Sequence, residues 1–450
     1  MLLPLNYHGR AESGCTSSLI VLLLGSALLV RSSPLSLATR RWGRTNPKLG
    51  RMLRYPTSVA VAPSLQIYTH EGCLKHKVMF HPESPERLRY LMEDIIPTLS
   101  SRLSFDVISP NRLPTKEDLQ LIHTPDYVES TFEAFRQVRD GHAVSVFLDS
   151  DTQVVEGTEE SAMRGAGVTL QAVEDVVEGK ALRAFVMVRP PGHHAEPNTA
   201  MGFCVFNNIM LGLAHAQRKY HKLIKRVALL DFDVHHGNGG QAACWEHPSR
   251  FFASTHQTPL FPWKGLSTDT GVQMNVVNVP LSKESTSQEF RDAWEHKILP
   301  SVRKYQPDMI FVSAGFDAHE DDPLASLNLV EDDFHFLTDK IARLANEVSN
   351  GRLVTVLEGG YDPDALGRCV TAHIEALAEA PLPSEAQLKG ETRSTDDRSL
   401  KVSMLFSREE IEAMDKSTIR AELAKLGLPT SGRLDSLKDR LGAVVSERYL

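Results

Sequence analysis

Residues 227–238 read VALLDFDVHHGN, and this stretch predicts the fold of the chain. Its apolar start, Val227–Leu230, has the length and composition of a short buried strand, and polar side chains follow at once. Asp231, Asp233 and His235 occupy every second position, so an extended backbone places their side chains on one face. A strand that runs directly into such residues is typical of a parallel sheet, where ligands bind beyond the carboxyl ends of the strands.

Three other segments repeat this arrangement of an apolar run with a polar end. Phe185–Val188 is followed by RPPGHH (189–194), Met309–Val312 by SAGFD (313–317), and Leu353–Leu357 by EGGY (358–361). Because the carboxyl ends of parallel strands open onto one edge of a sheet, the sequence predicts that all four polar ends meet in one crevice.

The surrounding residues, 66 to about 380, alternate short apolar runs with longer amphipathic stretches. This pattern is typical of a parallel sheet covered by helices, so the predicted fold class is α/β. A further strand is expected at Phe251–Ser254, and helices are expected at Pro85–Ile96, Glu159–Glu178, Asn207–Tyr220, Ser287–Tyr305 and Glu331–Val348.

The polar ends of the predicted strands indicate a metal centre. Carboxylates that are buried close together are unfavourable unless a cation lies among them. Asp233, His235 and Asp317 would supply three ligands and leave one position open, as catalytic zinc sites do. Zinc is the expected ion, although Fe(II) and Co(II) accept the same nitrogen and oxygen ligands.

The two neighbouring histidines would carry out proton transfer. Hydrolysis at a metal needs a base for the attacking water and an acid for the leaving amine. His193 and His194 could fill both roles if Asp231 and Asn238 orient them, and a carboxylate behind one ring would raise its pKa relative to the other. Tyr361, on a Gly-Gly hinge, could donate its hydroxyl to the developing oxyanion. Each signal alone has a structural explanation, such as a surface histidine or a turn, but their joint occurrence at strand ends favours a catalytic site.

RPPGHHA, GFCVFNN, DFDVHHGNG, SAGFDAH and EGGYD together resemble the signature blocks of the histone deacetylase superfamily, nearer to its class II and bacterial amidohydrolase-like members. HPESPERL and the Phe261-Pro262 pair fit the same pattern. The resemblance spans about residues 66–380 and implies an arginase-like α/β fold with a zinc ion at the foot of a narrow tunnel. It also implies the same metal ligands and catalytic residues that are named above.

Further residues are assigned only by this resemblance. Gly202, Phe203 and Phe261 would line the tunnel. Tyr361 stands where weakly active class IIa members carry histidine, so competent deacetylation is expected. Leu324 stands seven residues after the last metal ligand, where the polyamine-specific branch carries glutamate, which favours acetyl-lysine over acetylated polyamines. A buried monovalent cation, expected to be K⁺, would be held mostly by backbone oxygens of Asp231, Asp233, His235, Ser254 and Thr255.

Residues 1–65 look like a targeting leader. No Asp or Glu occurs from Ser13 to His70, and Leu19–Val30 is an apolar run of signal-peptide length. The Arg- and Ser-rich segment that follows has transit-peptide composition. A two-part leader for an organelle such as a complex plastid is expected, with a mitochondrial leader or an uncleaved anchor as alternatives, and nucleus or cytoplasm as the alternative location. No stable membrane association is expected after leader removal.

Charge and cysteine content describe the rest of the chain. With the acid-free segment set aside, the remainder is more acidic than the net charge of −8, which would attract cationic substrates. The five scattered cysteines never form a CxxC pair, so neither a disulfide framework nor a zinc finger is expected, and a reducing compartment is the simpler inference.

The C-terminal region is predicted to be a linker over residues 381–404 and a small helical hairpin over residues 405–450. Ile419, Leu423 and Leu426 share one helical stripe, Leu437 and Leu441 begin another, and Gly427 suits the end of a helix. The spacing resembles the SAP motif, which binds DNA, and an ordinary helical hairpin is the alternative.

DNA contacts would come from Arg433, Lys438 and Arg440. Two features weaken this expectation. Leu434 stands where the motif usually has lysine, and the acids Glu422, Asp435 and Asp439 dilute the positive charge on which affinity for DNA depends.

The expected function is hydrolysis of the acetyl amide of acetyl-lysine in proteins, with a possible tether to DNA. Two alternatives remain open. One is an amidohydrolase of small acetylated amines on the same scaffold. The other is a non-catalytic protein that binds acyl groups or DNA, against which the complete set of site residues argues.

Overall fold

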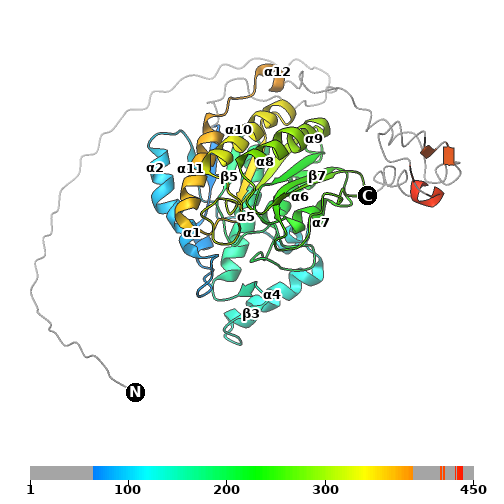
Figure 1. The fold of residues 1–450 in the computed structure, drawn as a ribbon. Helices are drawn as coiled ribbons and strands as arrows, with labels where there is room; N and C mark the ends of the chain where they lie inside the picture. Colours follow the sequence, from blue (N-terminus) through cyan, green and yellow to red (C-terminus); the bar gives the residue numbers. More distant parts are fainter. Residues whose placement is uncertain (1–63, 389–415, 418, 421–430, 432, 439–450) are drawn as a thin grey trace, which may run out of the picture. The chain divides into compact units, whose positions relative to one another are not determined.

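The computed structural model describes residues 64–388 and, near the C-terminus, residues 416–417, 419–420, 431 and 433–438. In the first range an eight-stranded, all-parallel sheet has the order β2-β1-β5-β10-β9-β6-β7-β8 (Figure 1). The strands are β1 Leu65–Tyr68, β2 Asp106–Ile108, β5 Arg183–Val186, β6 Val227–Asp231, β7 Arg250–Thr258, β8 Val276–Ser282, β9 Met309–Ala314 and β10 Leu353–Leu357. A separate antiparallel ribbon joins β3 (Val146–Phe147) and β4 (Gln153–Val154).

Helices cover both faces of this sheet. They are α1 Pro85–Tyr90, α2 Ile96–Ser100, α3 Lys116–Leu119, α4 Pro125–Arg139, α5 Thr158–Val177, α6 Asn208–Lys219, α7 Asn238–Cys244, α8 Ser287–Ala293, α9 Leu299–Tyr305, α10 Glu331–Val348, α11 Pro363–Glu379 and α12 Glu385–Leu388. Short η segments add a 3₁₀ turn at η1 (Glu71–Leu74) and π-helical turns at η2 (Leu91–Ile95) and η3 (Trp294–Ile298).

The direction of each crossover explains how the helices divide between the two faces. α5 and α6 pack against each other and on β5, β10 and β9, whereas α10 packs on α11 and β9 (Figure 1). The step from β5 through α6 to β6 runs one way across the sheet, and the step from β9 through α10 to β10 runs the other way. Because such crossovers are right-handed, α6 and α10 lie on opposite faces.

The central strands are buried along their whole length, which explains their apolar composition. Every residue of β5, β6, β9 and β10 is buried. A strand covered by helices on both sides has no solvent-facing positions, so it appears in the sequence as a continuous apolar run. These four strands are also neighbours in the sheet, in the order β5-β10-β9-β6.

The predicted α/β class is therefore confirmed, and the four apolar runs are adjacent strands of one sheet. The limits of β10 and α10 agree with the prediction, while β5 starts and ends two residues earlier than expected. The helices predicted over Pro85–Ile96 and Ser287–Tyr305 each contain a π-helical turn. β1, β2, β8, α4 and α11 were not predicted.

The leader and much of the tail lie outside the described residues, so the proposed domain limits stay predictions. In the described part of the tail, residues 434–438 are helical, and the side chains of Ile419 and Leu437 are buried. None of the helices in the described residues is both long and apolar enough to cross a membrane. Four of the five cysteines are described, and these are buried and free: Cys73, Cys204, Cys244 and Cys369.

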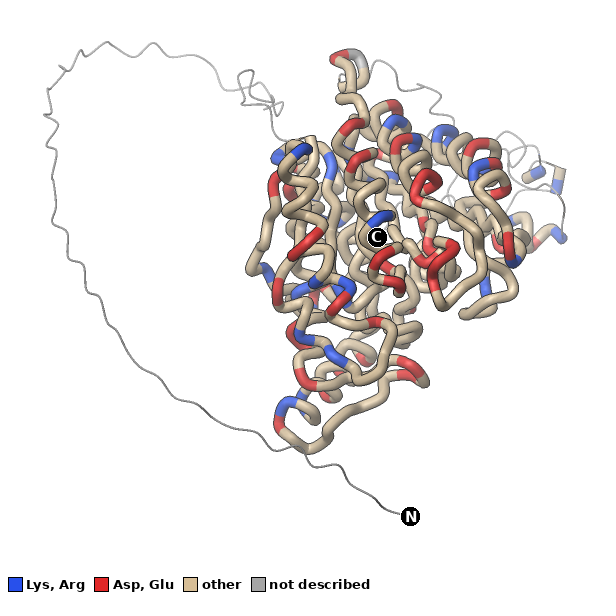
Figure 2. The backbone as a smooth tube through the Cα atoms, turned by 60° about the vertical axis from the view of Figure 1, so that its left-hand side comes forward, with Lys and Arg blue, Asp and Glu red and all other residues tan. Residues whose placement is uncertain are grey.

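Positively and negatively charged residues are interspersed along the described part of the chain. In the view of Figure 2, segments of Lys and Arg alternate with segments of Asp and Glu along the helices and loops.

Candidate active site

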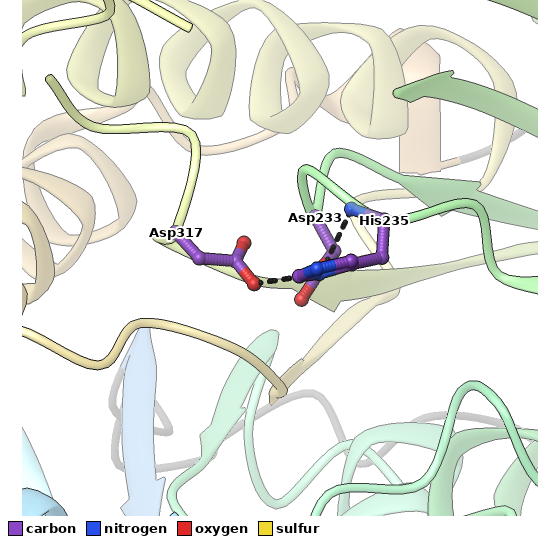
Figure 3. A group of neighbouring side chains, drawn as sticks. All are labelled: Asp233, His235 and Asp317. Atoms are coloured by element: carbon purple, nitrogen blue, oxygen red, sulfur yellow. Dashed lines mark hydrogen bonds and ion pairs between the residues drawn. The ribbon is translucent and has the colours of Figure 1, made fainter. Parts of the chain in front are cut away.

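The three predicted metal ligands meet at the carboxyl ends of β6 and β9. Asp233 and His235 follow β6, and Asp317 follows β9 (Figure 3). One ligand atom from each lies within 4.8 Å of the others. The Nδ1 atom of His235 is 3.1 Å from Asp233 Oδ1 and 3.1 Å from Asp317 Oδ2. Both carboxylates are buried, while the His235 side chain keeps 12 % exposure. The three potential ligand atoms therefore lie around one point, and solvent reaches this point on the side of His235.

The chemistry of these donors fits a divalent cation. Val234 N donates to Asp317 Oδ1 at 3.0 Å and Gly359 N donates to Asp233 Oδ2 at 2.8 Å, so the backbone fixes both carboxylates. The carboxylates outweigh the effect of burial on His235 and raise its pKa to about 10, so the pocket favours positive charge. A Cβ atom at Gly359 would lie 2.1 Å from Asp317 Oδ2, so glycine is required for this close approach. Two carboxylates and one imidazole suit zinc.

His193 and His194 lie beside this triad and have different hydrogen-bond partners. His193 Nδ1 is 3.0 Å from Asp231 Oδ2, and His194 Nδ1 is 2.8 Å from Asn238 Oδ1. The two imidazole rings are 4.0 Å apart between centroids, and His193 Nε2 is 3.7 Å from Asp233 Oδ2. The structure therefore brings together both histidines and the two partners that were predicted for them.

The surroundings of the two imidazoles give them opposite electrostatic preferences. Burial disfavours the charged form of His193, but Asp233 and Asp231 outweigh it and hold the pKa of His193 well above its usual value. Burial, reinforced by the neighbouring His193, holds the pKa of His194 well below its usual value. One imidazole is thus favoured as the proton donor and the other as the proton acceptor.

Tyr361 lies on the loop that follows β10. Asp322 fixes its backbone, because Tyr361 N donates to Asp322 Oδ2 at 2.6 Å and Leu324 N donates to Asp322 Oδ1 at 3.0 Å. The Arg87 guanidinium lies 4.7 Å from the centroid of the Tyr361 ring. Burial raises the pKa of Tyr361 well above its usual value, so its hydroxyl stays protonated and able to donate.

Aromatic rings from two loops flank the histidines and the tyrosine. The Phe203 ring lies 6.0 Å from the Tyr361 ring, and the Phe261 ring lies 5.1 Å from the His194 ring. A Cβ atom at Gly202 would meet His194 Cδ2 at 2.3 Å and Phe261 Cε1 at 3.0 Å, so Gly202 fills the space between these rings without room for a side chain. The three residues expected to line the tunnel are therefore at the site.

A buried ion-pair cluster around Glu83 holds the loops of the site. Glu83 Oε2 accepts from Arg189 Nη2 at 2.6 Å, and Glu83 Oε1 accepts from Arg87 Nη1 at 3.2 Å. Arg87 also donates to the carbonyls of Gly360 at 2.5 Å and Glu358 at 2.6 Å. The cluster thereby connects the loop before the histidines with the loop that carries the tyrosine. Sequence reasoning missed this role, although a glutamate and an arginine four residues apart in HPESPERL were a signal for the pair.

Glu358 is a second residue whose role the sequence did not reveal. Its Oε2 atom accepts from Gly192 N at 2.6 Å and from His193 N at 3.1 Å, so it fixes the backbone of the histidine loop. Burial raises the pKa of Glu358 to about 7. Position alone could not distinguish this carboxylate from the metal ligands, because it also follows a buried strand directly.

Two of the residues expected around a monovalent cation are neighbours in the sheet. Asp231 and Ser254 are paired in register across β6 and β7. Ser254 Oγ is 2.9 Å from His256 Nδ1, and Thr255 Oγ1 accepts from Trp294 Nε1 at 3.1 Å. Both hydroxyls thus have partners in the protein, and the cation site stays a prediction.

The predicted DNA-contacting residues are only partly described. Arg433 is exposed and Lys438 is half-buried, whereas Arg440 lies outside the described residues. Their role stays a prediction.

Comparison with known proteins gives the family. The sequence profile of the histone deacetylase domain matches residues 81–377. The chain is 33 % identical over 351 residues to "Histone deacetylase 14, chloroplastic" of Arabidopsis thaliana. The matched region covers 73 % of this chain and 81 % of that protein. It is 36 % identical over 306 residues to the "Histone deacetylase-like amidohydrolase" of Pseudomonas aeruginosa, with 66 % of this chain and 77 % of that protein covered.

A solved structure agrees with these sequence relationships. The crystal structure of the HDA15 HD domain superposes with a TM-score of 0.64 at 30 % identity and covers 73 % of this chain and 92 % of that one. The fold, the strand-end site and the matched domain lead to the same assignment, and the chain belongs to the histone deacetylase family.

Proposed function

We propose that this protein is a zinc-dependent deacetylase that hydrolyses the acetyl amide of acetyl-lysine in proteins. The observation that carries the proposal is the set of groups at one point of the sheet edge. Two histidines with opposite proton preferences and a protonated tyrosine surround the three donors of Asp233, His235 and Asp317. Family membership supports a hydrolase that acts on acetylated substrates.

Each group of the chain would have one task in the reaction. When bound, zinc supplies Lewis-acid chemistry that polarises the acetyl carbonyl and acidifies water. His194, held neutral, accepts the proton of the attacking water at Nε2. His193, held protonated by Asp231, adds positive charge beside the reaction and is placed to supply a proton to the leaving amine. The hydroxyl of Tyr361 donates to the oxyanion as charge develops on it.

Leu324 supports a lysine side chain rather than a polyamine as the substrate. Leu324 and Tyr361 donate their backbone N–H groups to the same Asp322 carboxylate, so Leu324 lies near the reacting groups. The two acids beside it have other partners. Asp322 accepts from the two backbone N–H groups, and Asp321 pairs with Arg368 at 2.7 Å. An apolar residue there gives no attraction to the second ammonium of a diamine, whereas a peptide needs none.

Turnover of an acetyl-lysine peptide compared with N-acetylputrescine tests the substrate assignment. We expect a higher kcat/KM for the peptide, and Leu324→Glu should raise kcat/KM for the acetylated diamine while lowering it for the peptide. A preference of the unaltered enzyme for the diamine would contradict the lysine assignment and favour the small-amine amidohydrolase. No turnover of either, with zinc bound, would favour the non-catalytic alternative.

A structural K⁺ is proposed at Asp231, Asp233, His235, Ser254 and Thr255. Support comes from the adjacent register of Asp231 and Ser254, both buried, at the end of β6. Dialysis against K⁺-free buffer with Na⁺ or a large organic cation should lower the thermal midpoint of the zinc-loaded enzyme, and addition of K⁺ should restore it.

A plastid is the proposed destination. Two relatives carry the word "chloroplastic" in their names, from Arabidopsis thaliana and from Oryza sativa subsp. japonica. The acid-free, Arg- and Ser-rich composition of the leader gives independent support. A fluorescent protein fused after residue 70 should enter the organelle, whereas nuclear or cytoplasmic fluorescence would contradict this destination.

A further inference from the structure

A chain of polar side chains runs from His194 to the surface. His194 Nδ1 is 2.8 Å from Asn238 Oδ1, and Asn238 Nδ2 donates to Glu196 Oε1 at 2.7 Å. Glu196 Oε1 also accepts from Lys264 Nζ at 2.5 Å. The Asn238 residue is buried, whereas the Glu196 and Lys264 side chains are 19 % and 46 % exposed. Glu196 takes no part in the proposed reaction steps.

The orientation of the Asn238 amide decides which nitrogen of His194 carries the proton. With Oδ1 toward the ring, His194 must donate from Nδ1, and the lone pair of Nε2 faces the site. With the amide turned over, the NH₂ group would donate to Nδ1, and the proton of the neutral ring would then be on Nε2. A ring protonated at Nε2 cannot accept a proton from water.

We propose that Glu196 is a positioning residue that fixes the Asn238 amide with its oxygen toward His194, and thereby keeps Nε2 of His194 free to act as the base. Glu196 offers only acceptors, so the nitrogen end of the amide must face it. The carbonyl of His194 accepts from the same nitrogen at 3.1 Å and acts in the same direction. Met201 Sδ is a third, weaker acceptor at 3.5 Å. Of the three acceptors Glu196 is the charged one, and charge-assisted hydrogen bonds are the stronger ones.

The ion pair between Glu196 and Lys264 contributes to the same positioning. The ammonium of Lys264 lies 2.5 Å from the same Glu196 oxygen that accepts from Asn238, so it fixes the position of that carboxylate. Glu196 also connects the loop of the two histidines with the loop of Phe261, because Lys264 lies three residues after that phenylalanine.

Glu196→Met tests the role, because methionine keeps the size of the side chain and removes every strong acceptor. We expect kcat for the acetyl-lysine peptide to fall by about tenfold, the effect typical of losing a residue that orients a catalytic side chain, with KM and bound zinc nearly unchanged. Glu160→Met is the matched control, since Glu160 also pairs with a lysine, Lys75, at 2.5 Å but has no hydrogen bond to Asn238. This control should keep full activity.

A second background separates positioning from a general loss of structure. Asn238→Asp gives His194 a carboxylate, which has only acceptor atoms and cannot be turned into a donor. In this background Glu196→Met should leave kcat unchanged or raise it, because it now removes a like charge. A loss of kcat of the same size in both backgrounds would overturn the proposal.

The tautomer can also be observed without turnover, which matters because the inference rests on the proposed hydrolase function. In the zinc-loaded protein with ¹⁵N-labelled histidine, the ring signals of His194 can be assigned by their loss in His194→Ala. We expect the proton on Nδ1 in the unaltered protein and a population with the proton on Nε2 in Glu196→Met. An unchanged tautomer would refute the positioning role even if the proposed substrate proved wrong.

Discussion

Two adjacent histidines of the same chain have different partners and different surroundings. His193 faces a carboxylate oxygen of Asp231, and His194 faces an amide oxygen of Asn238. The carboxylate carries a full charge and stabilises an imidazolium, whereas the amide only fixes the direction of the ring. At the scale of the residue, the division of labour between acid and base follows from the carboxylates around His193 and from the burial of His194 beside it.

His194→Ala should remove the base without disturbing the metal. We expect peptide turnover to fall by roughly 10²–10⁴-fold, the usual contribution of general acid–base catalysis. The zinc content, measured by atomic absorption, should remain near one per chain, because His194 is not among the three donors that face one another. Loss of zinc in this variant would show that ligand and base have been assigned wrongly. His296→Ala, at a mostly exposed histidine, is the control and should retain activity.

At the scale of the element, the loops of the site depend on a carboxylate that never touches the substrate. Glu83, directly before α1, pairs with Arg189 on the loop after β5 and with Arg87 on α1. All three side chains are almost fully buried. Removal of one member of such a cluster leaves the others charged and unpaired inside the protein, which is far more costly than the pair is stabilising.

Glu83→Gln should destabilise the protein by about 3–5 kcal/mol at neutral pH, measured by urea unfolding. The pH dependence follows from the pKa of Glu83, which the arginines, against the effect of burial, hold at about 2 instead of 4.5. A depressed carboxyl pKa stabilises the folded state above pH 4.5, and this contribution disappears as the pH falls from 4.5 toward 2. The difference in the free energy of unfolding between the unaltered protein and Glu83→Gln should therefore become smaller below pH 4.5. Glu93→Gln, at an exposed glutamate, should change stability by less than about 1 kcal/mol.

The elements that could be predicted from the sequence are those with continuous apolar runs or long amphipathic periods. β6, β9, β10 and α10 are of this kind, and their buried faces are visible in the residue pattern itself. β2 could not be found in this way, because it has three residues and two of them are exposed. The π-helical turns were also missed, because each lies inside a segment that was predicted as one continuous helix.

The site was more predictable than the order of the strands. Asp233, His235 and Asp317 could be grouped because strand ends share an edge, but only the structure shows β5, β10, β9 and β6 as neighbours. Glu83, Asp322 and Glu196 were not assigned a role, because each acts through contacts with distant segments. Glu83, for example, meets Arg189 across 106 positions of the chain. Sequence spacing carries no information on such pairs.

At the scale of the whole molecule, the metal centre and the stability of the fold are coupled. His235 and Asp317 are 82 positions apart, and they meet only when β6 and β9 are paired. An ion bound by both segments therefore binds the folded chain far better than the unfolded one. This difference in affinity stabilises the folded state by mass action.

Removal of the metal with a chelator should abolish hydrolysis and lower the thermal midpoint together. At a free zinc concentration of about 100 times the Kd, the lost stabilisation would be about 2.7 kcal/mol. Addition of zinc should restore both properties, and Asp317→Asn should respond much less to either treatment because one ligand charge is lost. Hydrolysis that persisted in the fully chelated protein would contradict a metal-dependent mechanism.

The tail should contribute to location and not to chemistry, because every residue of the site lies between Glu83 and Tyr361. Deletion of residues 405–450 should therefore leave kcat/KM for an acetyl-lysine peptide unchanged and weaken retention on DNA at low salt. Suppose that Arg433, Lys438 and Arg440 each neutralise one phosphate. A plot of the logarithm of the DNA affinity against the logarithm of the salt concentration should then have a slope of about −3. Arg433→Ala should reduce the magnitude of that slope by about one. DNA affinity that survives the deletion would place the contacts elsewhere, and affinity that is absent from the full chain would leave the helical hairpin as a docking element for another protein.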